Sequence, residues 1–265
     1  MKNFSIAKKI LTVIGAVAFW VLIWAGLHRH VGQEILLVSP VRAIERLIEL
    51  AVTPLFWGAV YSTFSRVAEG FGMAVLAGGM LAIITSHSAL LERLFAPILA
   101  SIRATPVASV IILALVWLAT ARIPVFIVFL MVTPIVWTNL YTGFGAVDIQ
   151  LLEMAKVFRF SLIRKIRYIY LPALMPYFAA ACATGIGAAW KSAIAAEVIA
   201  RPAGSMGRHI YNSRIYLQTA DLFAWTIGVI LLSVALEKLA SRLIDYFSRK
   251  ISGQPKLKKE ARRWG

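Results

Sequence analysis

Long apolar runs separated by short charged stretches dominate the sequence and predict membrane-spanning helices. A helix needs about 20 mostly apolar residues to cross about 30 Å of hydrocarbon. Six runs approach that length, and they are residues 10–27, 71–91, 104–121, 123–147, 171–190 and 222–236. We expect the short last run either to continue through Glu237 and Lys238 or to form a re-entrant or surface helix. The pattern therefore predicts an all-α polytopic membrane protein, with six transmembrane helices over residues 10–247.

Three other segments place apolar side chains at helical spacing among charged ones. Residues 41–51 follow Pro40, where a helix can begin, and residues 56–71 lead into the second span. We expect both helices to lie at a membrane interface or to pack on a neighbouring bundle. Residues 148–172 form the third segment. The apolar stripe of this segment needs a cover, which either lipid headgroups or a docked protein could provide.

Basic residues are distributed unevenly between the two sides of this predicted topology. With an internal N-terminus, residues 1–9, 92–103, 148–170 and the chain from 239 onward hold 18 Lys and Arg, whereas the outer segments hold nine. This bias predicts that both termini are cytoplasmic. The net charge of +16 is then explained by the inner membrane face, so no nucleic acid partner is needed. We expect the basic tail, residues 248–265, to lie near anionic membrane lipid.

Composition excludes several other classes of protein. Apolar residues make up 60% of the chain and charged residues 15%, and the mean hydropathy is +0.78. These values exclude a disordered chain and argue against a soluble enzyme. The single cysteine, Cys182, permits no intrachain disulfide.

The sequence contains no pattern typical of catalysis or of metal binding. Its four histidines are scattered, and none has the i, i+4 spacing of a helical metal site. Residues 185–192 resemble a nucleotide-binding loop, but Trp190 stands where that loop needs a glycine before the lysine. We therefore expect no catalytic residue, no metal and no bound cofactor in this chain. Small residues crowd the fifth span, where they serve either helix packing alone or a transport pathway.

Residues 153–172 resemble the EAA loop of binding-protein-dependent ABC importer permeases. Glu153-Met154-Ala155, Arg159 and Ile169-Tyr170-Leu171-Pro172 reproduce the spacing of that loop. The stretches that resemble the nitrate, sulfonate and taurine branch of this family are 36–40, 66–71, 103–106, 189–191, 195–197 and 204–207 with 217–219. The likeness extends from about residue 36 to residue 247.

Two residues depart from the family pattern. Met154 replaces an alanine, which a helix tolerates, and Arg159 replaces the glycine of the turn between two short helices. A non-glycine residue holds a left-handed conformation only at a cost. The turn is therefore expected to be reshaped, or the helix to run straighter, with a partner ATPase adapted to it.

The resemblance implies the type I ABC importer fold and a non-enzymatic subunit of the bacterial cytoplasmic (inner) membrane. It implies a homodimer or a pair of permeases, two cytosolic ATPases that hold ATP-Mg, and an extracytoplasmic binding protein. It further implies a small, anionic solute, such as a nitrate-, sulfonate- or taurine-like compound or a vitamin precursor. The residues expected to couple this chain to the ATPase are Glu153, Met154, Ala155, Phe158, Arg159, Leu171 and Pro172. Ala155 and Phe158 are expected to supply the apolar contact, and Glu153 is expected near a helix start, where its carboxylate favours the helix dipole.

A secondary transporter or channel is the main alternative, but intramembrane acids or a repeated half would be expected for it. An intramembrane enzyme is a third possibility, against which the lack of a catalytic constellation argues. For the pathway, we expect Trp190, Lys191 and Glu197 near the outer mouth, with residues 192–200 dipping into the membrane or folding over the bundle. Lys191 either attracts an anion, with Glu197 as its partner when no solute is present, or is only an interfacial anchor. In the second case the pathway would lie around Thr105 and Thr133.

Overall fold

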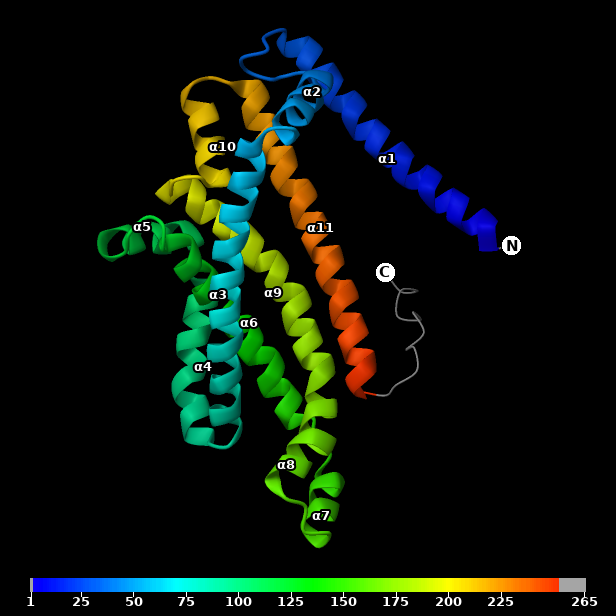
Figure 1. Cartoon of the computed structure of the whole chain (residues 1–265), viewed down its shortest axis with the longest axis vertical. Coiled ribbons are helices and arrows are strands. Elements are labelled where there is room, and N and C mark those ends of the chain that lie inside the picture. The colour runs from blue at the N-terminus through cyan, green and yellow to red at the C-terminus, as the bar shows by residue number, and fades with distance from the viewer. Residues whose placement is uncertain (1, 253–265) are drawn as a thin grey trace. The chain divides into compact units, whose positions relative to one another are not determined.

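The computed structural model describes the backbone of residues 2–252 and the side chains of residues 12 and 14–244. Within that range every regular element is a helix, as the sequence predicts (Figure 1). The helices are α1 (Lys2–Val31), α2 (Pro40–Ala51), α3 (Pro54–Ser86), α4 (Ala89–Ala104), α5 (Val107–Trp117), α6 (Ile123–Gly145), α7 (Ile149–Val157), α8 (Leu162–Lys165), the π-helical turn η1 (Ile166–Tyr170), α9 (Leu171–Ala200), α10 (Met206–Ile215) and α11 (Thr219–Ser252). Most of the predicted basic tail lies outside the described residues, as do the side chains of residues 1–9.

Among the residues that the structure describes, five helices are long and apolar enough to cross a membrane, and a sixth span exists if α4 and α5 count as one. The five lie in α1, α3, α6, the stretch Leu162–Ala200 and Thr219–Ile244. The last of these runs through Glu237 and Lys238 as one helix, which confirms the first of the two expectations for this segment. The structure is therefore that of an all-α, multi-pass membrane protein.

The prediction of a straight third span over residues 104–121 is wrong. Residues 92–103, expected to form a loop, belong to α4, and α5 leaves α4 at an angle of 103°. The break falls at Thr105 and Pro106 because a residue that precedes proline is disfavoured in the α conformation. With 11 residues, α5 is about 16 Å long, too short to cross the membrane by itself.

The predicted helix over residues 56–71 leads into the second span without a break. Residues 54–86 form the single helix α3, which no proline interrupts after Pro54. The predicted helix after Pro40 is confirmed as α2. Pro40 occupies its first turn, and the hydroxyl of Ser39 accepts a hydrogen bond from the backbone amide of Arg42 at 3.2 Å.

The chain divides into two compact units, each described here by itself. Unit 1 comprises residues 2–62 and Arg201–Leu231. Aromatic rings hold it together, since Trp225 of α11 stacks on Phe56 at 5.2 Å and on His209 at 4.6 Å between ring centroids. The guanidinium of Arg46 on α2 donates to the carboxylate of Asp221.

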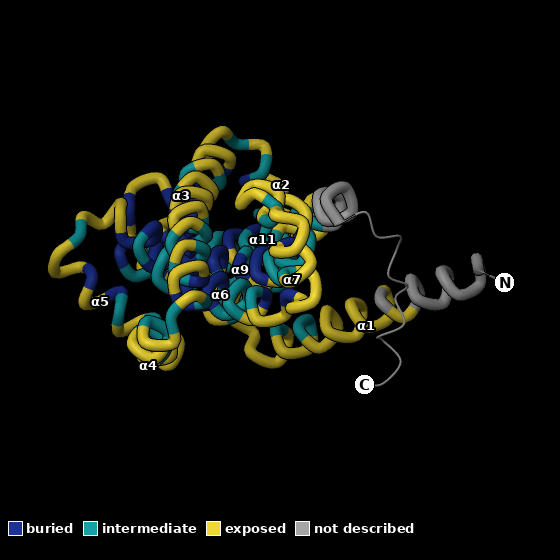
Figure 2. The backbone as a smooth tube through the Cα atoms, turned by 90° about the horizontal axis from the view of Figure 1, so that it is seen from below, coloured by how far each residue is buried: buried dark blue, intermediate teal, exposed yellow. Residues whose placement is uncertain are grey.

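Unit 2 comprises Thr63–Ala200 and residues 232–252, and its core is the pair of helices α6 and α9. The burial pattern in Figure 2 shows this core, whereas much of α4 and α5 is exposed. Two glycines of α3 allow that helix to approach α6 closely. An added Cβ would lie 2.5 Å from the carbonyl oxygen of Val125 at Gly70, and 2.8 Å from that of Thr133 at Gly78. The close approach fixes how α3 packs on α6.

Candidate functional site

The predicted coupling loop folds as a helix, a tight turn and a second helical stretch that continues into α9. Asp148 caps the N-terminus of α7, and its carboxylate accepts a hydrogen bond from the amide of Gln150 at 2.8 Å. Glu153 is the fifth residue of α7 and is exposed, so the N-terminal position expected for it belongs to Asp148. The carboxylate of Glu153 therefore does not cap the N-terminus of α7. Leu171 and Pro172 form the first turn of α9.

Arg159 occupies a left-handed turn with a φ of 49°. The amide of Phe160 donates to the carbonyl of Ala155 at 2.9 Å, and the amide of Arg159 donates to the carbonyl of Lys156 at 3.1 Å. These two bonds define a Schellman motif, in which glycine is the usual left-handed residue. The turn of the family pattern is thus kept, and the expected straighter helix is not formed.

The loop buries one part of its apolar stripe and exposes the other. Ala155 is fully buried with Val147 and Ile169, so its side chain is not available for the apolar contact expected of it. Phe160 packs on the same cluster. The apolar side chains that remain exposed on α7 and its turn are Ile149, Leu151, Met154, Val157 and Phe158. Phe158, which is 69% exposed, is therefore the expected contact residue that the structure leaves free to meet a partner.

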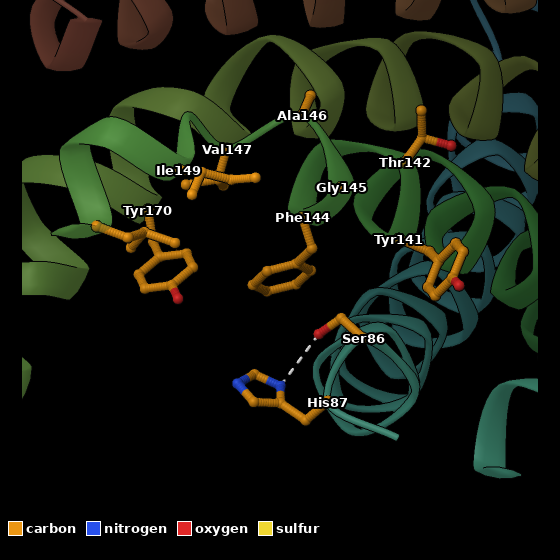
Figure 3. A pocket seen from close by; sticks show the side chains of 11 residues that line it. Ser86, His87, Tyr141, Thr142, Phe144, Gly145, Ala146, Val147, Ile149 and Tyr170 are labelled. Carbon is orange, nitrogen blue, oxygen red and sulfur yellow. Dashed lines mark hydrogen bonds between the residues drawn. The ribbon is translucent and has the colours of Figure 1, made fainter. Parts of the chain in front are cut away.

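A pocket of about 800 Å³, which the sequence does not predict, lies beside this loop. It lies among the ends of α3 and α6, the start of α7, and η1 (Figure 3). His87, Phe144 and Tyr170 line it with rings, and the side chains of Ser86 and His87 are 3.1 Å apart. The pocket could not be found from sequence because its walls come from three segments that are far apart along the chain and come together only in the folded protein.

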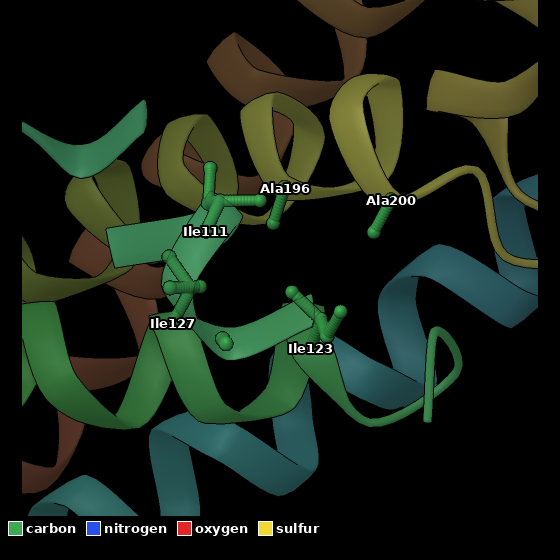
Figure 4. Packing of buried hydrophobic residues seen from close by; sticks show 6 residues of the cluster. Ile111, Ile123, Ile127, Ala196 and Ala200 are labelled. Carbon is green, nitrogen blue, oxygen red and sulfur yellow. The ribbon is translucent and has the colours of Figure 1, made fainter. Parts of the chain in front are cut away.

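The second half of α9 is buried. Residues 192–200 continue the helix, so the prediction that they dip into the membrane or fold over the bundle is wrong. No glycine or proline interrupts the alanine-rich stretch before Pro202. Ala196 and Ala200 pack against Ile111 of α5 and against Ile123 and Ile127 of α6 (Figure 4). Trp190, expected near a pathway mouth, is 1% exposed.

Glu197 is completely buried and makes its contacts with α3. Its carboxylate accepts a hydrogen bond from the hydroxyl of Thr63 at 2.9 Å and pairs with the guanidinium of Arg66 at 3.2 Å. The expected pairing of Glu197 with Lys191 is therefore replaced by one with Arg66. Six residues along a helix correspond to a rotation of about 600°, so the two side chains point about 120° apart.

Lys191 instead lines a pocket of about 490 Å³ next to the bend between α4 and α5. The pocket is lined by Ile102, Arg103, Val107, Met131, Ile135, Ala188, Lys191, Ser192 and Ala195. Arg103 thus comes together with Lys191, although sequence reasoning assigned it no role. The signal was present, because both residues belong to stretches that resemble the family, residues 103–106 and 189–191.

The two alternative pathway residues do not line this pocket. Thr133 is 6% exposed, and its hydroxyl donates to the carbonyl of Phe129 at 2.6 Å within α6. Thr105 is exposed at the end of α4, where its hydroxyl donates to the carbonyl of Ser101 at 2.7 Å. Both hydroxyls thus satisfy backbone carbonyls of their own helices. Among the described residues, no group of three or more His, Cys, Asp or Glu side chains could hold a metal ion.

The fold is that of ABC transporter membrane subunits. A solved structure described as an amino acid ABC transporter with histidines superimposes with a TM-score of 0.61 at 20% identity, covering 77% of this chain and 97% of that one. Residues 74–253 match the family of binding-protein-dependent transport system inner membrane components. The chain belongs to this family.

Two relatives are similar over most of their length. The putative aliphatic sulfonates transport permease SsuC of Bacillus subtilis is 27% identical over 251 residues, which cover 94% of this chain and 88% of SsuC. The nitrate import permease NrtB of Synechocystis is 26% identical over 245 residues, which cover 86% of this chain and 88% of NrtB. These matches confirm the family and the branch that the sequence motifs indicate.

Proposed function

We propose that this permease forms the pathway of an ATP-driven importer and that a cytosolic ATPase docks on α7 and its turn. The observation that carries the proposal is the exposed apolar end of the loop. Val157 and Phe158 are 79% and 69% exposed, whereas Ala155 and Ile169 of the same loop are buried with Val147. Because exposed aromatic side chains dominate many interfaces, Phe158 is the expected anchor.

The distribution of charge supports an orientation with both termini in the cytoplasm. This orientation places the loop, with its five Lys and Arg over residues 148–170, on the same side as an ATPase. ATP and Mg²⁺ would bind to that ATPase, since this chain lacks a phosphate-binding loop. Two copies of the permease, or this permease with a second one, would enclose the pathway. An extracytoplasmic binding protein would deliver the solute.

The names of the relatives support a small anionic solute. SsuC and NrtB are named for sulfonates and nitrate, and a related permease is named for bicarbonate. Lys191 of this chain is an exposed cationic group on α9, the central helix of unit 2. A cation at a constriction lowers the barrier for an anion to enter.

Co-purification of the ATPase with variant permeases tests the docking site. Phe158→Ser should weaken the complex by about 2 kcal/mol, or roughly 30-fold, because it removes an interface anchor. Glu153→Lys should detach the ATPase or uncouple ATP hydrolysis from uptake, with normal membrane insertion. Ile112→Ser is the matched control, since Ile112 is 60% exposed on α5, away from the loop. An intact complex with normal transport in both loop variants would contradict the assignment.

The same preparations separate an ABC importer from a secondary transporter. Uptake into proteoliposomes should require the ATPase, internal ATP and the binding protein together. Uptake that persists when the ATPase is omitted, driven by an ion gradient alone, would favour the alternative.

A further inference from the structure

The 490 Å³ pocket of unit 2 is lined by two cationic side chains and by no acidic one. Arg103 reaches it from the last turn of α4, and Lys191 from α9. Among the side chains that the structure describes, neither forms an ion pair with Asp or Glu. The four ion pairs of α2 and the pairs Arg66–Glu197 and Arg122–Glu69 use other residues. The pocket therefore concentrates positive charge that no described acid of the chain neutralises.

The pocket lies near mid-length of a membrane-spanning helix. Met131 and Ile135 of its wall are eight and 12 residues beyond Ile123, the start of α6, which places them about 12–18 Å along a helix of about 35 Å. Cationic side chains at such a depth are costly and usually mark an ion or substrate site. Lysine can reach an interface by extending its stem, but this explanation becomes weaker for two cations that meet in one pocket.

The rest of the wall is apolar. Val107, Met131 and Ile135 supply hydrocarbon side chains, and the hydroxyl of Ser192 already donates to the carbonyl of Ala189 at 3.1 Å. Such walls cannot replace the water around a strongly hydrated ion. They suit a solute that has one charged oxygen-rich group and a short apolar tail.

We propose that Arg103 and Lys191 together bind the anionic head of the transported solute, which is an organic monoanion of the sulfonate or carboxylate class. The planar guanidinium donates two parallel hydrogen bonds to a pair of oxygens, and the ammonium supplies a second positive charge. The apolar wall holds the tail of the solute. This inference rests on the proposed function, because it assumes that unit 2 contributes to a transport pathway.

Binding to the permease–ATPase complex in nanodiscs of neutral phosphatidylcholine tests the proposal. The probe is 1-propanesulfonate, and the neutral compound methyl propyl sulfone serves as its uncharged counterpart. Affinity is read from the unfolding midpoint of the complex as the probe concentration rises. We expect 1-propanesulfonate to raise the midpoint and the sulfone to have no effect.

Arg103→Gln and Lys191→Gln should each weaken binding about tenfold or more, because each removes a charge-assisted hydrogen bond. Arg103→Lys should weaken it less, since it keeps the charge but loses the paired geometry. Arg93→Gln is the matched control, because Arg93 is an exposed arginine of α4 that does not line the pocket. Unchanged binding in this variant is expected.

The proposal is wrong if 1-propanesulfonate leaves the wild-type midpoint unchanged. It is also wrong if the double variant, which combines Arg103→Gln with Lys191→Gln, binds 1-propanesulfonate normally. A phospholipid phosphate could use the same two cations, so the series is repeated with phosphatidylglycerol in the nanodiscs. One outcome would identify the pocket as a lipid site and overturn the proposal. In it, phosphatidylglycerol raises the unfolding midpoint of the wild type but not of the Arg103→Gln and Lys191→Gln variants, and 1-propanesulfonate has no effect. ATPase retention is measured on the same samples. Loss of the ATPase from the wild type would count against the proposed function instead, whatever the probe shows.

Discussion

Two charged positions of α9, six residues apart, have opposite electrostatic surroundings. Glu197 is fully buried, and both Thr63 and Arg66 of α3 contact its carboxylate. Lys191 is exposed in a pocket where the other charged side chain, Arg103, is also cationic. The first position is neutralised within the chain, whereas the second has no described acid to neutralise it.

The difference shows that the direction in which a side chain points decides what a charge can do. The rotation of about 120° between the two positions turns Glu197 toward α3 and Lys191 toward the α4–α5 bend. A buried pair connects helices, and its loss leaves a charge without a partner. An unmatched cation in an open pocket is available to a ligand. Substitution of Glu197 should therefore lower the stability of the fold, whereas substitution of Lys191 should leave the stability nearly unchanged and weaken ligand binding.

The largest effect is expected for Glu197→Leu. This change leaves the guanidinium of Arg66, whose side chain is 15% exposed, without its carboxylate. The free energy of unfolding should fall by about 3–5 kcal/mol, as for other buried pairs that lose one partner. Denaturant unfolding of the purified protein in detergent measures it.

Two further variants determine whether charge is the cause. The double variant Arg66→Met with Glu197→Leu should recover most of the loss, because it removes both charges. Lys191→Leu should change the stability by no more than about 0.5 kcal/mol, as expected for an exposed side chain. If Lys191→Leu destabilised as strongly as Glu197→Leu, the contrast between the two positions would not hold.

The second prediction concerns how closely α3 packs beside the Arg66–Glu197 pair. At Gly70 an added Cβ would lie 2.5 Å from the backbone oxygen of Val125, which cannot move away easily. Gly70→Ala should therefore destabilise by about 1–3 kcal/mol. At Gly72 nothing lies within 4 Å, so Gly72→Ala should stabilise by about 0.5–1 kcal/mol through helix propensity. Shifts of the unfolding midpoint in opposite directions from the wild type, downward for Gly70→Ala and upward for Gly72→Ala, would confirm the close packing of α3 on α6.

The sequence predicts the helical class, five of the six spans and the helical segment at residues 148–172, because each depends on local composition or on a contiguous motif. It does not predict the bend after Ala104, since a run of 18 apolar residues conceals the effect of Pro106 on Thr105. It also gives Glu197 the wrong partner. Proximity along the chain favours Lys191, whereas Arg66 is 131 residues away and comes close only when α3 packs beside α9.

Arg159 gives a third test, with a smaller expected effect on stability. Like Lys191 it is exposed and cationic, but it does not line the pocket that contains Arg103 and Lys191. Its φ of 49° is costly for any residue with a Cβ. Arg159→Gly should therefore stabilise the turn by about 0.5–1 kcal/mol, after the greater freedom of glycine in the unfolded chain is subtracted. Slower hydrogen exchange of the α7 amides would measure this effect. Arg159→Lys should leave exchange unchanged, and neither variant should alter 1-propanesulfonate affinity, in contrast to Lys191→Gln.

The smallest effect is expected in unit 1, where His209 resembles Glu197 in being enclosed but lacks a salt-bridge partner among the described residues. Its ring stacks on Trp225, and burial lowers the pKa of His209 below its ordinary value of 6.5, helped by nearby Arg208 and opposed by Asp221. Below pH 6.5 the unfolded chain therefore binds a proton before the folded protein does. Stability should fall as the pH drops below this value and level off once the folded histidine is protonated.

A pH series of unfolding midpoints measures this loss in the wild type and in His209→Gln. The variant should lack the step because glutamine does not titrate, and His30→Gln, which replaces an exposed histidine of α1, should retain it. If His209→Gln kept the full step, another group would carry the pH dependence. Enclosure by aromatic rings would then have less influence on charge in this protein than the direct pairing seen at Glu197.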